Sequence, residues 1–113
     1  MSLLLVSAIA EDTLAAPSNA LSSYIVVSVT DANGVAVTGL VMPFFLVGSP
    51  VVPVGGVVSR LVAADPAGTV TGVYRLQVQP QGGVNWKAGV YVWSVGVTHG
   101  GDHGQTLCSV LMN

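Results

Sequence analysis

Hydrophobic and polar residues alternate with a period of two in several short segments of the chain. The clearest case is the segment 73–79, where apolar and polar side chains take turns: Tyr74, Leu76 and Val78 against Arg75, Gln77 and Gln79. Such alternation predicts a β-strand with one buried and one solvated face, as in an antiparallel sheet. Valine and threonine, which favour strands, are frequent along the whole sequence.

Glycine or proline interrupts this pattern about every ten residues, which is the spacing of short strands and turns. The pattern predicts about seven strands, at Leu3–Ile9, Ser23–Thr30, Val41–Val47, Val57–Ala63, Val73–Gln79, Val90–Thr98 and Gln105–Met112. The connecting segments are predicted as a loop through Pro17, a turn at Asp31–Gly34, an extended piece at Val35–Thr38, a loop or broken edge strand at Ser49–Gly56, a turn at Asp65–Gly68, a loop at Pro80–Gly89 and a Gly-rich turn at His99–Gly104.

Helix signals are confined to Glu11–Ser22, where Pro17 allows at most a turn or two. An antiparallel sheet must cover its apolar face with another layer, and without helices that layer is a second sheet. The sequence therefore predicts an all-β protein, an antiparallel β-sandwich of about seven strands forming a single domain over residues 1–113.

The last two predicted strands carry apolar side chains on both faces. In the segment Val90–Thr98, Val92 lies opposite to the face that holds Tyr91 and Trp93. In the segment Gln105–Met112, Leu107 and Leu111 share one face while Cys108 lies on the other. Val92, Leu107 and Leu111 are therefore candidate interface residues, covered by a partner protein or by another copy of the chain. The alternative is that these side chains stay exposed in a monomer.

Composition narrows the classes of function. Of 113 residues only eight are charged, three Lys or Arg and five Asp or Glu, while 51% are hydrophobic. Three cations, Arg60, Arg75 and Lys87, do not make the cluster that nucleic-acid binding needs, so no nucleic-acid partner is expected. The apolar runs, such as Val41–Val47, are much shorter than the ~20 residues of a membrane-spanning helix, so no transmembrane segment is predicted.

The charges fall mostly in or beside predicted turns, and only Arg60 and Arg75 fall within predicted strands. This placement predicts that the sheet faces are nearly uncharged on both sides and that at least one outer face of the sandwich is normally covered. Residues 1–10 have no positive charge at their start, so they are interpreted as a first strand rather than a secretory signal. The compartment stays open, and the single Cys108 is interpreted as a small buried hydrophobic residue.

Three segments resemble those of bacterial immunoglobulin-like domains. Residues 25–39, with the sequence IVVSVTDANGVAVTG, resemble the strand–turn–strand hairpin of such domains. Residues 72–78 (GVYRLQV) and 86–97 (WKAGVYVWSVGV) resemble their strands with the pattern Gly-x-Tyr. The resemblance implies an immunoglobulin-like sandwich with a scaffold or binding role, and it implies that Tyr91, with Tyr74 as a parallel case, is a corner tyrosine. The chain departs from antibody domains because it lacks their cysteine pair, and Trp93 stands two residues after Tyr91, where a cysteine is expected.

Two features are candidate ligand sites. His99, Asp102 and His103 lie in one stretch of five residues inside a predicted turn, and their side chains are of the types that bind Zn²⁺. The alternative is an ordinary polar turn, since the spacing matches no established metal motif. Trp86, in the loop before the sixth strand, is a candidate for stacking on a sugar or anchoring a partner, or else it closes one end of the core.

Nucleophile motifs, phosphate-binding glycine loops and paired carboxylates are missing from the sequence. No catalytic residue, no cofactor and no enzymatic activity are therefore expected. The sequence predicts a non-catalytic structural or protein-interaction module, with a protein partner or a homo-oligomer. The alternative is a small-ligand module that binds a sugar through Trp86 or a metal through His99, Asp102 and His103.

Overall fold

Seven β-strands make up most of the computed structural model, which describes residues 3–11 and 22–112. The strands are β1 (Leu5–Ala10), β2 (Ser23–Thr30), β3 (Phe45–Val51), β4 (Ser59–Pro66), β5 (Val73–Pro80), β6 (Gly89–His99) and β7 (Asp102–Met112). Two short 3₁₀ helices, η1 (Met42–Phe44) and η2 (Gln81–Gly83), complete the elements, and the described residues form no α-helix. The predicted all-β class is thereby confirmed. The helical turn and the loop expected around Pro17 lie in residues 12–21, outside the described part.

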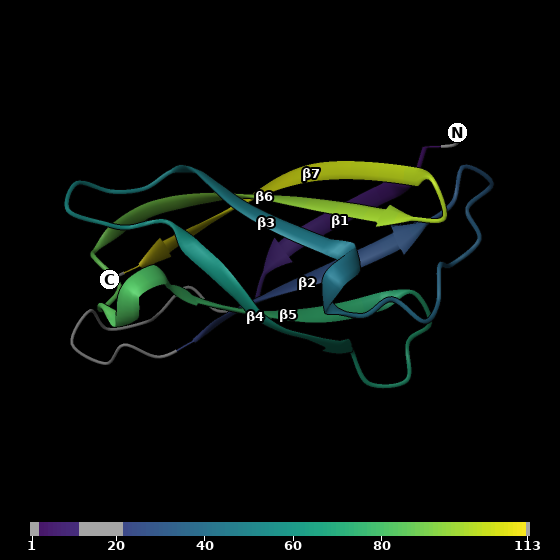
Figure 1. The fold of residues 1–113 in the computed structure, drawn as a ribbon, viewed down its shortest axis with the longest axis horizontal. Helices are drawn as coiled ribbons and strands as arrows, with labels where there is room; N and C mark the ends of the chain where they lie inside the picture. Colours follow the sequence, from purple (N-terminus) through teal and green to yellow (C-terminus); the bar gives the residue numbers. More distant parts are fainter. Residues whose placement is uncertain (1–2, 12–21, 113) are drawn as a thin grey trace.

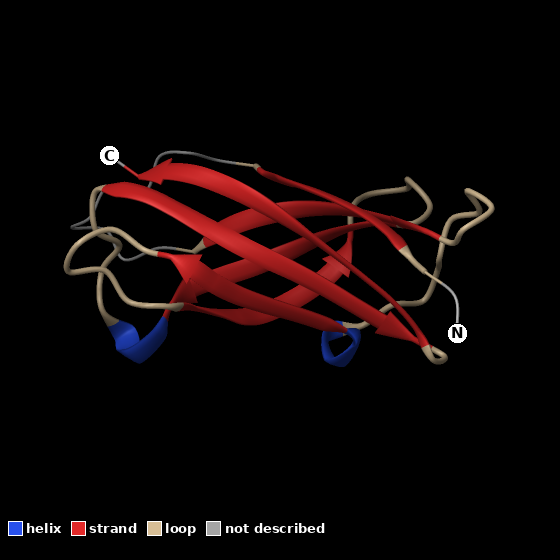
Figure 2. Ribbon diagram, turned by 90° about the horizontal axis from the view of Figure 1, so that it is seen from above, coloured by secondary structure: helices blue, strands red, loops and turns tan. Residues whose placement is uncertain are grey.

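The strands form two antiparallel sheets, one of four strands in the order β1-β2-β5-β4 and one of three in the order β3-β6-β7. Figure 1 shows the two sheets lying one over the other, and Figure 2 shows their strands crossing at an angle. This arrangement is the β-sandwich that the alternating pattern predicted, because each sheet covers the apolar face of the other.

Inward-facing side chains of both sheets fill the space between them. In β5 the alternation is as predicted: Tyr74, Leu76 and Val78 are buried, and Arg75 between them is exposed. The buried hydrophobic residues are Leu4, Ile25, Val27, Val29, Leu40, Phe45, Tyr74, Leu76, Val78, Trp86, Tyr91, Trp93, Val95, Val97, Val110 and Met112. Both sheets contribute to this core, so burial alone does not distinguish one sheet from the other.

The long connection between β2 and β3 is held by two polar anchors. The Asp31 carboxylate accepts hydrogen bonds from the backbone N–H groups of Asn33 and Val35, which fixes the predicted turn at Asp31–Gly34. Further along, the Tyr74 hydroxyl donates to the carbonyl oxygen of Val37 at 2.5 Å and accepts from the N–H of Leu40 at 3.3 Å. These bonds hold the segment before η1 against β5 of the four-stranded sheet.

The edge strands β1 and β7 meet along one side of the sandwich. The N–H of Leu4 donates to the carbonyl oxygen of His103 at 2.8 Å, and Leu3 and His103 form an isolated parallel bridge. Gly104 permits this approach because a Cβ at that position would collide with the carbonyl oxygen of Leu4. The first predicted strand, Leu3–Ile9, is therefore shared between two sheets, with only Leu5–Ala10 in the ladder with β2.

The region between β2 and β5 differs from the prediction in two places. The strand expected at Val41–Val47 begins only at Phe45, because Pro43 occupies the start of η1, where its missing N–H is not needed. It then continues to Val51, so part of the segment Ser49–Gly56 that was predicted as a loop or broken edge strand pairs with β6 through a bulge. The turn predicted at Asp65–Gly68 begins later than expected, at Gly68 and Thr69, because Asp65 pairs with Arg75 and β4 ends at Pro66. Because β4 is an edge strand, it tolerates a proline.

Candidate interaction face

The outward side of the three-stranded sheet collects the three predicted interface residues. In the register of β6 and β7, Val92 pairs with Ser109, Val90 with Leu111, and Ser94 with Leu107. Residues opposite each other point to the same side of a sheet, and Tyr91 and Trp93 occupy the buried side. The structure therefore brings Val92, Leu107 and Leu111 together on one outward surface.

This surface, here called the three-stranded face, also includes residues that the sequence analysis did not select. Leu46 of β3 is 75% exposed, the largest exposure among the large hydrophobic residues in the strands of this sheet. The full set of outward residues is Leu46, Gly48, Val51, Val90, Val92, Ser94, Gly96, Thr98, His103, Gln105, Leu107, Ser109 and Leu111. None of them is Asp, Glu, Lys or Arg. The residues after Pro43 form a continuous apolar run, Phe44–Val47, so the sequence showed neither which side of the strand Leu46 takes nor which sheet that strand joins.

The three-stranded face is hollowed beside Gly96. A groove of about 470 Å³ lies there, lined on this face by Leu46, Gly96, Thr98, His103 and Gln105 and closed at one end by η1. Gly96 adds no side chain to the floor of the groove, while Leu46 rises beside it. The face therefore combines exposed leucines with an adjoining depression.

The outward side of the other sheet, here called the four-stranded face, has a different chemistry. Its residues are Leu5, Ser7, Ile9, Tyr24, Val26, Ser28, Thr30, Val73, Arg75, Gln77, Gln79, Arg60, Ala63 and Asp65. The Arg75 guanidinium donates two hydrogen bonds to the Glu11 carboxylate at 2.7 and 2.8 Å and lies 3.6 Å from the centre of the Tyr24 ring. The bonds to Glu11 raise the pKa of Arg75, and the large apolar residues Leu5 and Ile9 lie on the edge strand β1.

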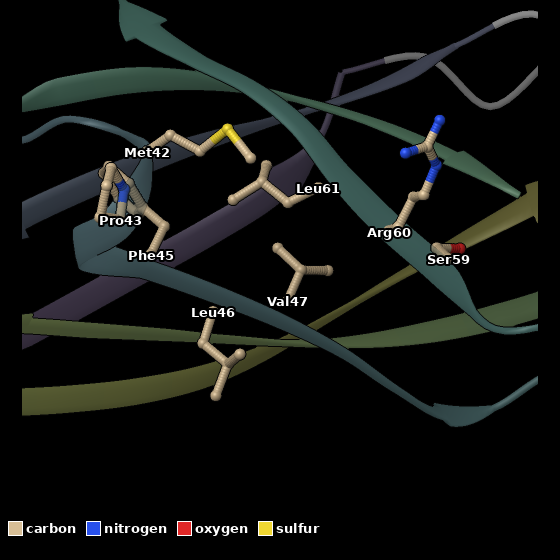
Figure 3. Close-up of a pocket in the computed structure, with 8 residues that line it drawn as sticks. All are labelled: Met42, Pro43, Phe45, Leu46, Val47, Ser59, Arg60 and Leu61. Atoms are coloured by element: carbon tan, nitrogen blue, oxygen red, sulfur yellow. The ribbon is translucent and has the colours of Figure 1, made fainter. Parts of the chain in front are cut away.

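A second cavity of about 400 Å³ opens where β3 and β4, edge strands of different sheets, run beside each other (Figure 3). Its lining is mainly apolar, with Met42, Phe45, Val47 and Leu61 among its residues. Ser59, on its wall, is already engaged, since its hydroxyl accepts a hydrogen bond from the Trp93 indole N–H at 3.0 Å. This cavity is thus a gap at the side of the core with few polar groups to orient a ligand.

The predicted Gly-rich turn at His99–Gly104 is shorter than expected. Only Gly100 and Gly101, both with positive φ, form the hairpin turn, while Asp102 pairs with His99 and His103 pairs with Thr98. Consecutive residues of a strand point to opposite faces, so His103 and Asp102 diverge. The His99 ring packs edge-on against Phe44 at 5.5 Å. The described residues contain no group of three or more His, Cys, Asp and Glu side chains able to hold a metal ion.

Trp86 does not lie on the surface. It is fully buried and packs edge-on against Tyr91 at 5.2 Å and against Trp93 at 6.1 Å. The indole has no exposed face on which a sugar could stack, so the alternative interpretation, closure of one end of the core, describes its position. Lys87, the next residue, is exposed, and its backbone N–H donates to the Tyr91 hydroxyl at 3.0 Å.

Cys108 lies on the inward side of β7 opposite Trp93 and is partly buried. Desolvation raises the pKa of its thiol to about 11. The thiolate, which is the reactive form of cysteine, is therefore scarce at neutral pH, and the position suits a packed side chain better than a nucleophile.

Comparison with known proteins does not assign the chain to a family. No family model matches the chain, and no curated protein or solved structure matches it at a significant level. Among the described residues, no helix is long and apolar enough to cross a membrane. The cations Arg60, Arg75 and Lys87 lie on β4, on β5 and in the loop before β6, and nothing in this arrangement suggests a nucleic-acid surface.

Proposed function

We propose that this protein is a non-catalytic interaction module with an immunoglobulin-like fold, a subunit or appended domain of a larger assembly. It contacts its protein partner through the three-stranded face. The observation that carries this proposal is the lack of charge on that face, whose exposed residues include Leu46, Leu107 and Leu111. A sheet face that meets water usually carries polar and charged side chains, as the four-stranded face does.

The immunoglobulin-like assignment is supported by the order of the strands. In constant-type immunoglobulin domains the first, second, fifth and fourth strands form one sheet, and the third, sixth and seventh form the other. The same order occurs here. The hydrogen bond from the N–H of Lys87 to the Tyr91 hydroxyl also resembles the corner tyrosine of that fold. Trp93, two residues later, fills the core where antibody domains have a cysteine.

A role without catalysis is supported by the placement of the reactive side chains. The partly buried Cys108 thiol has a raised pKa, and His103 and Asp102 point to opposite faces of the sheet. The exposed leucines offer a different source of free energy, because apolar area removed from water contributes about 25 cal/mol per Å². The three-stranded face is also rigid, since the ladders of β3, β6 and β7 fix its backbone. A rigid surface loses little conformational entropy on binding.

Cysteine labelling in cells tests whether the three-stranded face is covered. A Cys108→Ser chain carries one new cysteine, either Leu107→Cys on the three-stranded face or Ile9→Cys on the four-stranded face. Residue 9 is a matched control, because Ile9 and Leu107 are 68% and 59% exposed and both lie on edge strands. The reaction with N-ethylmaleimide is followed by mass spectrometry in the cells that naturally make the protein and in purified protein at about 1 μM.

We expect the cysteine at position 107 to react at least tenfold more slowly in cells than in dilute solution. The cysteine at position 9 should react at similar rates in both settings. Equal rates for the two positions in cells would overturn the proposal, because the three-stranded face would then be as open as the four-stranded face. Circular dichroism of each purified variant establishes that the sandwich is intact.

A further inference from the structure

We infer that the partner of the three-stranded face is a second copy of this chain, packed face to face. This inference rests on the proposed function and names its partner. Two identical faces can pack only if no like charges meet, and the outward residues of β3, β6 and β7 include no Asp, Glu, Lys or Arg. The four-stranded face carries the charged side chains of Arg60, Asp65 and Arg75, which packing against a second copy would remove from water at a cost in free energy.

The projections and hollows of the three-stranded face also suit packing against a second copy. A symmetric dimer uses the same patch on both subunits, so that patch must offer both a projection and a hollow. Leu107 projects from β7 beside Ser94, one outward position along β6 from Gly96, where the groove of about 470 Å³ lies. Leu46 projects from β3 opposite Gly96. Leucines of one copy can therefore enter the groove of the other.

The area is sufficient for a weak dimer. The strand β6 has 11 residues. With a rise of about 3.4 Å per residue and three strands spaced by about 4.8 Å, the face measures roughly 500 Å². Two copies would bury roughly 1,000 Å², which is the lower limit for a specific interface. An interface of this size is typical of weak, transient association, so the protein is expected to associate only at high concentration.

Pairing through strand edges is less suited to association. The edge strand β3 carries Pro50 and a bulge between Gly48 and Val51, and the edge strand β4 has a bulge between Leu61 and Ala63. On the other side of the sandwich, β1 and β7 are tied together by the bond from Leu4 to His103. Bulges, prolines and covered edges all oppose the addition of a further strand. The outward leucines have no such protection.

Sedimentation velocity of the full chain between about 1 and 200 μM tests this inference. We expect the wild-type protein to pass from monomer to dimer within this range. Leu46→Glu, which places a charge on the edge strand β3 of the proposed interface, opposite Gly96, should weaken association at least tenfold. Ile9→Glu is the matched control, with a similarly exposed residue on the four-stranded face, and it should change association less than twofold.

Gly96→Val provides a second variant that fills the groove rather than adding a charge. A Cβ at Gly96 meets only ordinary contacts, the nearest at 3.8 Å to Leu46, so the monomer accommodates it. Its association should also fall at least tenfold while its thermal unfolding stays close to that of the wild type. If Gly96→Val loses both its association and its folded structure, the lost association does not support the face-to-face dimer. The result for Leu46→Glu then decides.

A wild-type chain that remains a monomer at 200 μM overturns the inference, as does association that Leu46→Glu leaves unchanged. The labelling experiment separates these failures from failure of the proposed function. A monomeric chain whose residue 107 is protected in cells has a different protein as its partner, so the interaction module stands and only the second copy is excluded. A monomeric chain with no protection at residue 107 overturns both proposals.

Discussion

The two sheets share one interior and differ on their outer faces. Inward, Leu76 of β5 and Val95 of β6 are equally buried, because each sheet must cover the other. Outward, β5 presents Arg75, which is bonded to Glu11, whereas β6 presents Val92. In both sheets the alternation places apolar side chains in the core, as folding of the sandwich requires. The difference in the outer residues is what the proposed interaction of the three-stranded face accounts for.

Exposed apolar residues also occur in the loops, but there they are separate. Val35, Val54 and Val70 stand on three different connections. Single exposed valines are ordinary on protein surfaces. On the three-stranded face, by contrast, Leu107 and Leu111 lie two outward positions apart on one strand, next to Val90 and Val92. Contiguity rather than exposure is thus what separates this face from the connecting loops.

The interior that the sheets share is the most sensitive place to perturb. Trp93 of β6 is fully buried and bonds across the sandwich to Ser59 of β4. Trp93→Ala should lower the free energy of unfolding by about 3–5 kcal/mol, because it opens a cavity and leaves the Ser59 hydroxyl unpaired. Urea denaturation followed by circular dichroism measures this. The adjacent outward variant Ser94→Ala should change the free energy by less than about 1 kcal/mol, and similar losses for both would contradict the assignment of faces.

Two glycines of the β6–β7 pair should respond in opposite directions. A Cβ at Gly104, on the inward side, would collide with the carbonyl oxygen of Leu4 and approach Val6 to 2.9 Å, so Gly104→Ala should cost about 1–3 kcal/mol. A Cβ at Gly96, on the outward side, meets no closer atom than 3.8 Å. Gly96→Ala should therefore be neutral or stabilise the fold by up to about 1 kcal/mol, since alanine loses less chain entropy. Thermal unfolding of both variants checks the difference, and equal destabilisation would show that the outer face is as tightly packed as the inner side.

The smallest effect is expected on the four-stranded face. Arg75→Ala removes an exposed ion pair with Glu11 and the contact with Tyr24, so the melting temperature should fall by at most a few degrees. The loss should shrink as salt is raised towards about 1 M, because salt screens exposed charges. Arg60→Ala is the control, since it removes the same charge from this face but no ion pair of the described residues. Association of the chain should be unaffected in both variants.

Local pattern was sufficient for the strands that are paired on both sides. The predicted Ser23–Thr30 agrees with β2 at both ends, and β5 and β6 lie within one residue of their predicted bounds. Prediction was poorest at the edge strands β3 and β4, where Pro50 and Pro66 fell in segments predicted as a loop or broken edge strand and as a turn. An edge strand needs hydrogen bonds on one side only, so proline does not have to end it.

The candidate sites were likewise predicted well where the signal was local and poorly where it depended on distant residues. Val92, Leu107 and Leu111 were placed correctly on one side of their strands because side-chain alternation is a local property. Trp86 was harder to assign, since a loop residue shows no alternation and its burial depends on Tyr91 and Trp93. The histidine pair looked like a cluster in the sequence, but the hairpin turn is so short that His103 joins the strand.

The sequence by itself determined that the chain forms antiparallel strands, that one side of each is apolar and that few charges are available. Those properties follow from residues two positions apart and need no knowledge of distant neighbours. Only the tertiary structure decided that β3, β6 and β7 share one sheet, which joins Leu46 to Leu107 and Leu111 in a single uncharged face. Strand order depends on pairings between residues far apart in the chain, and period-two alternation contains no information about which strands pair.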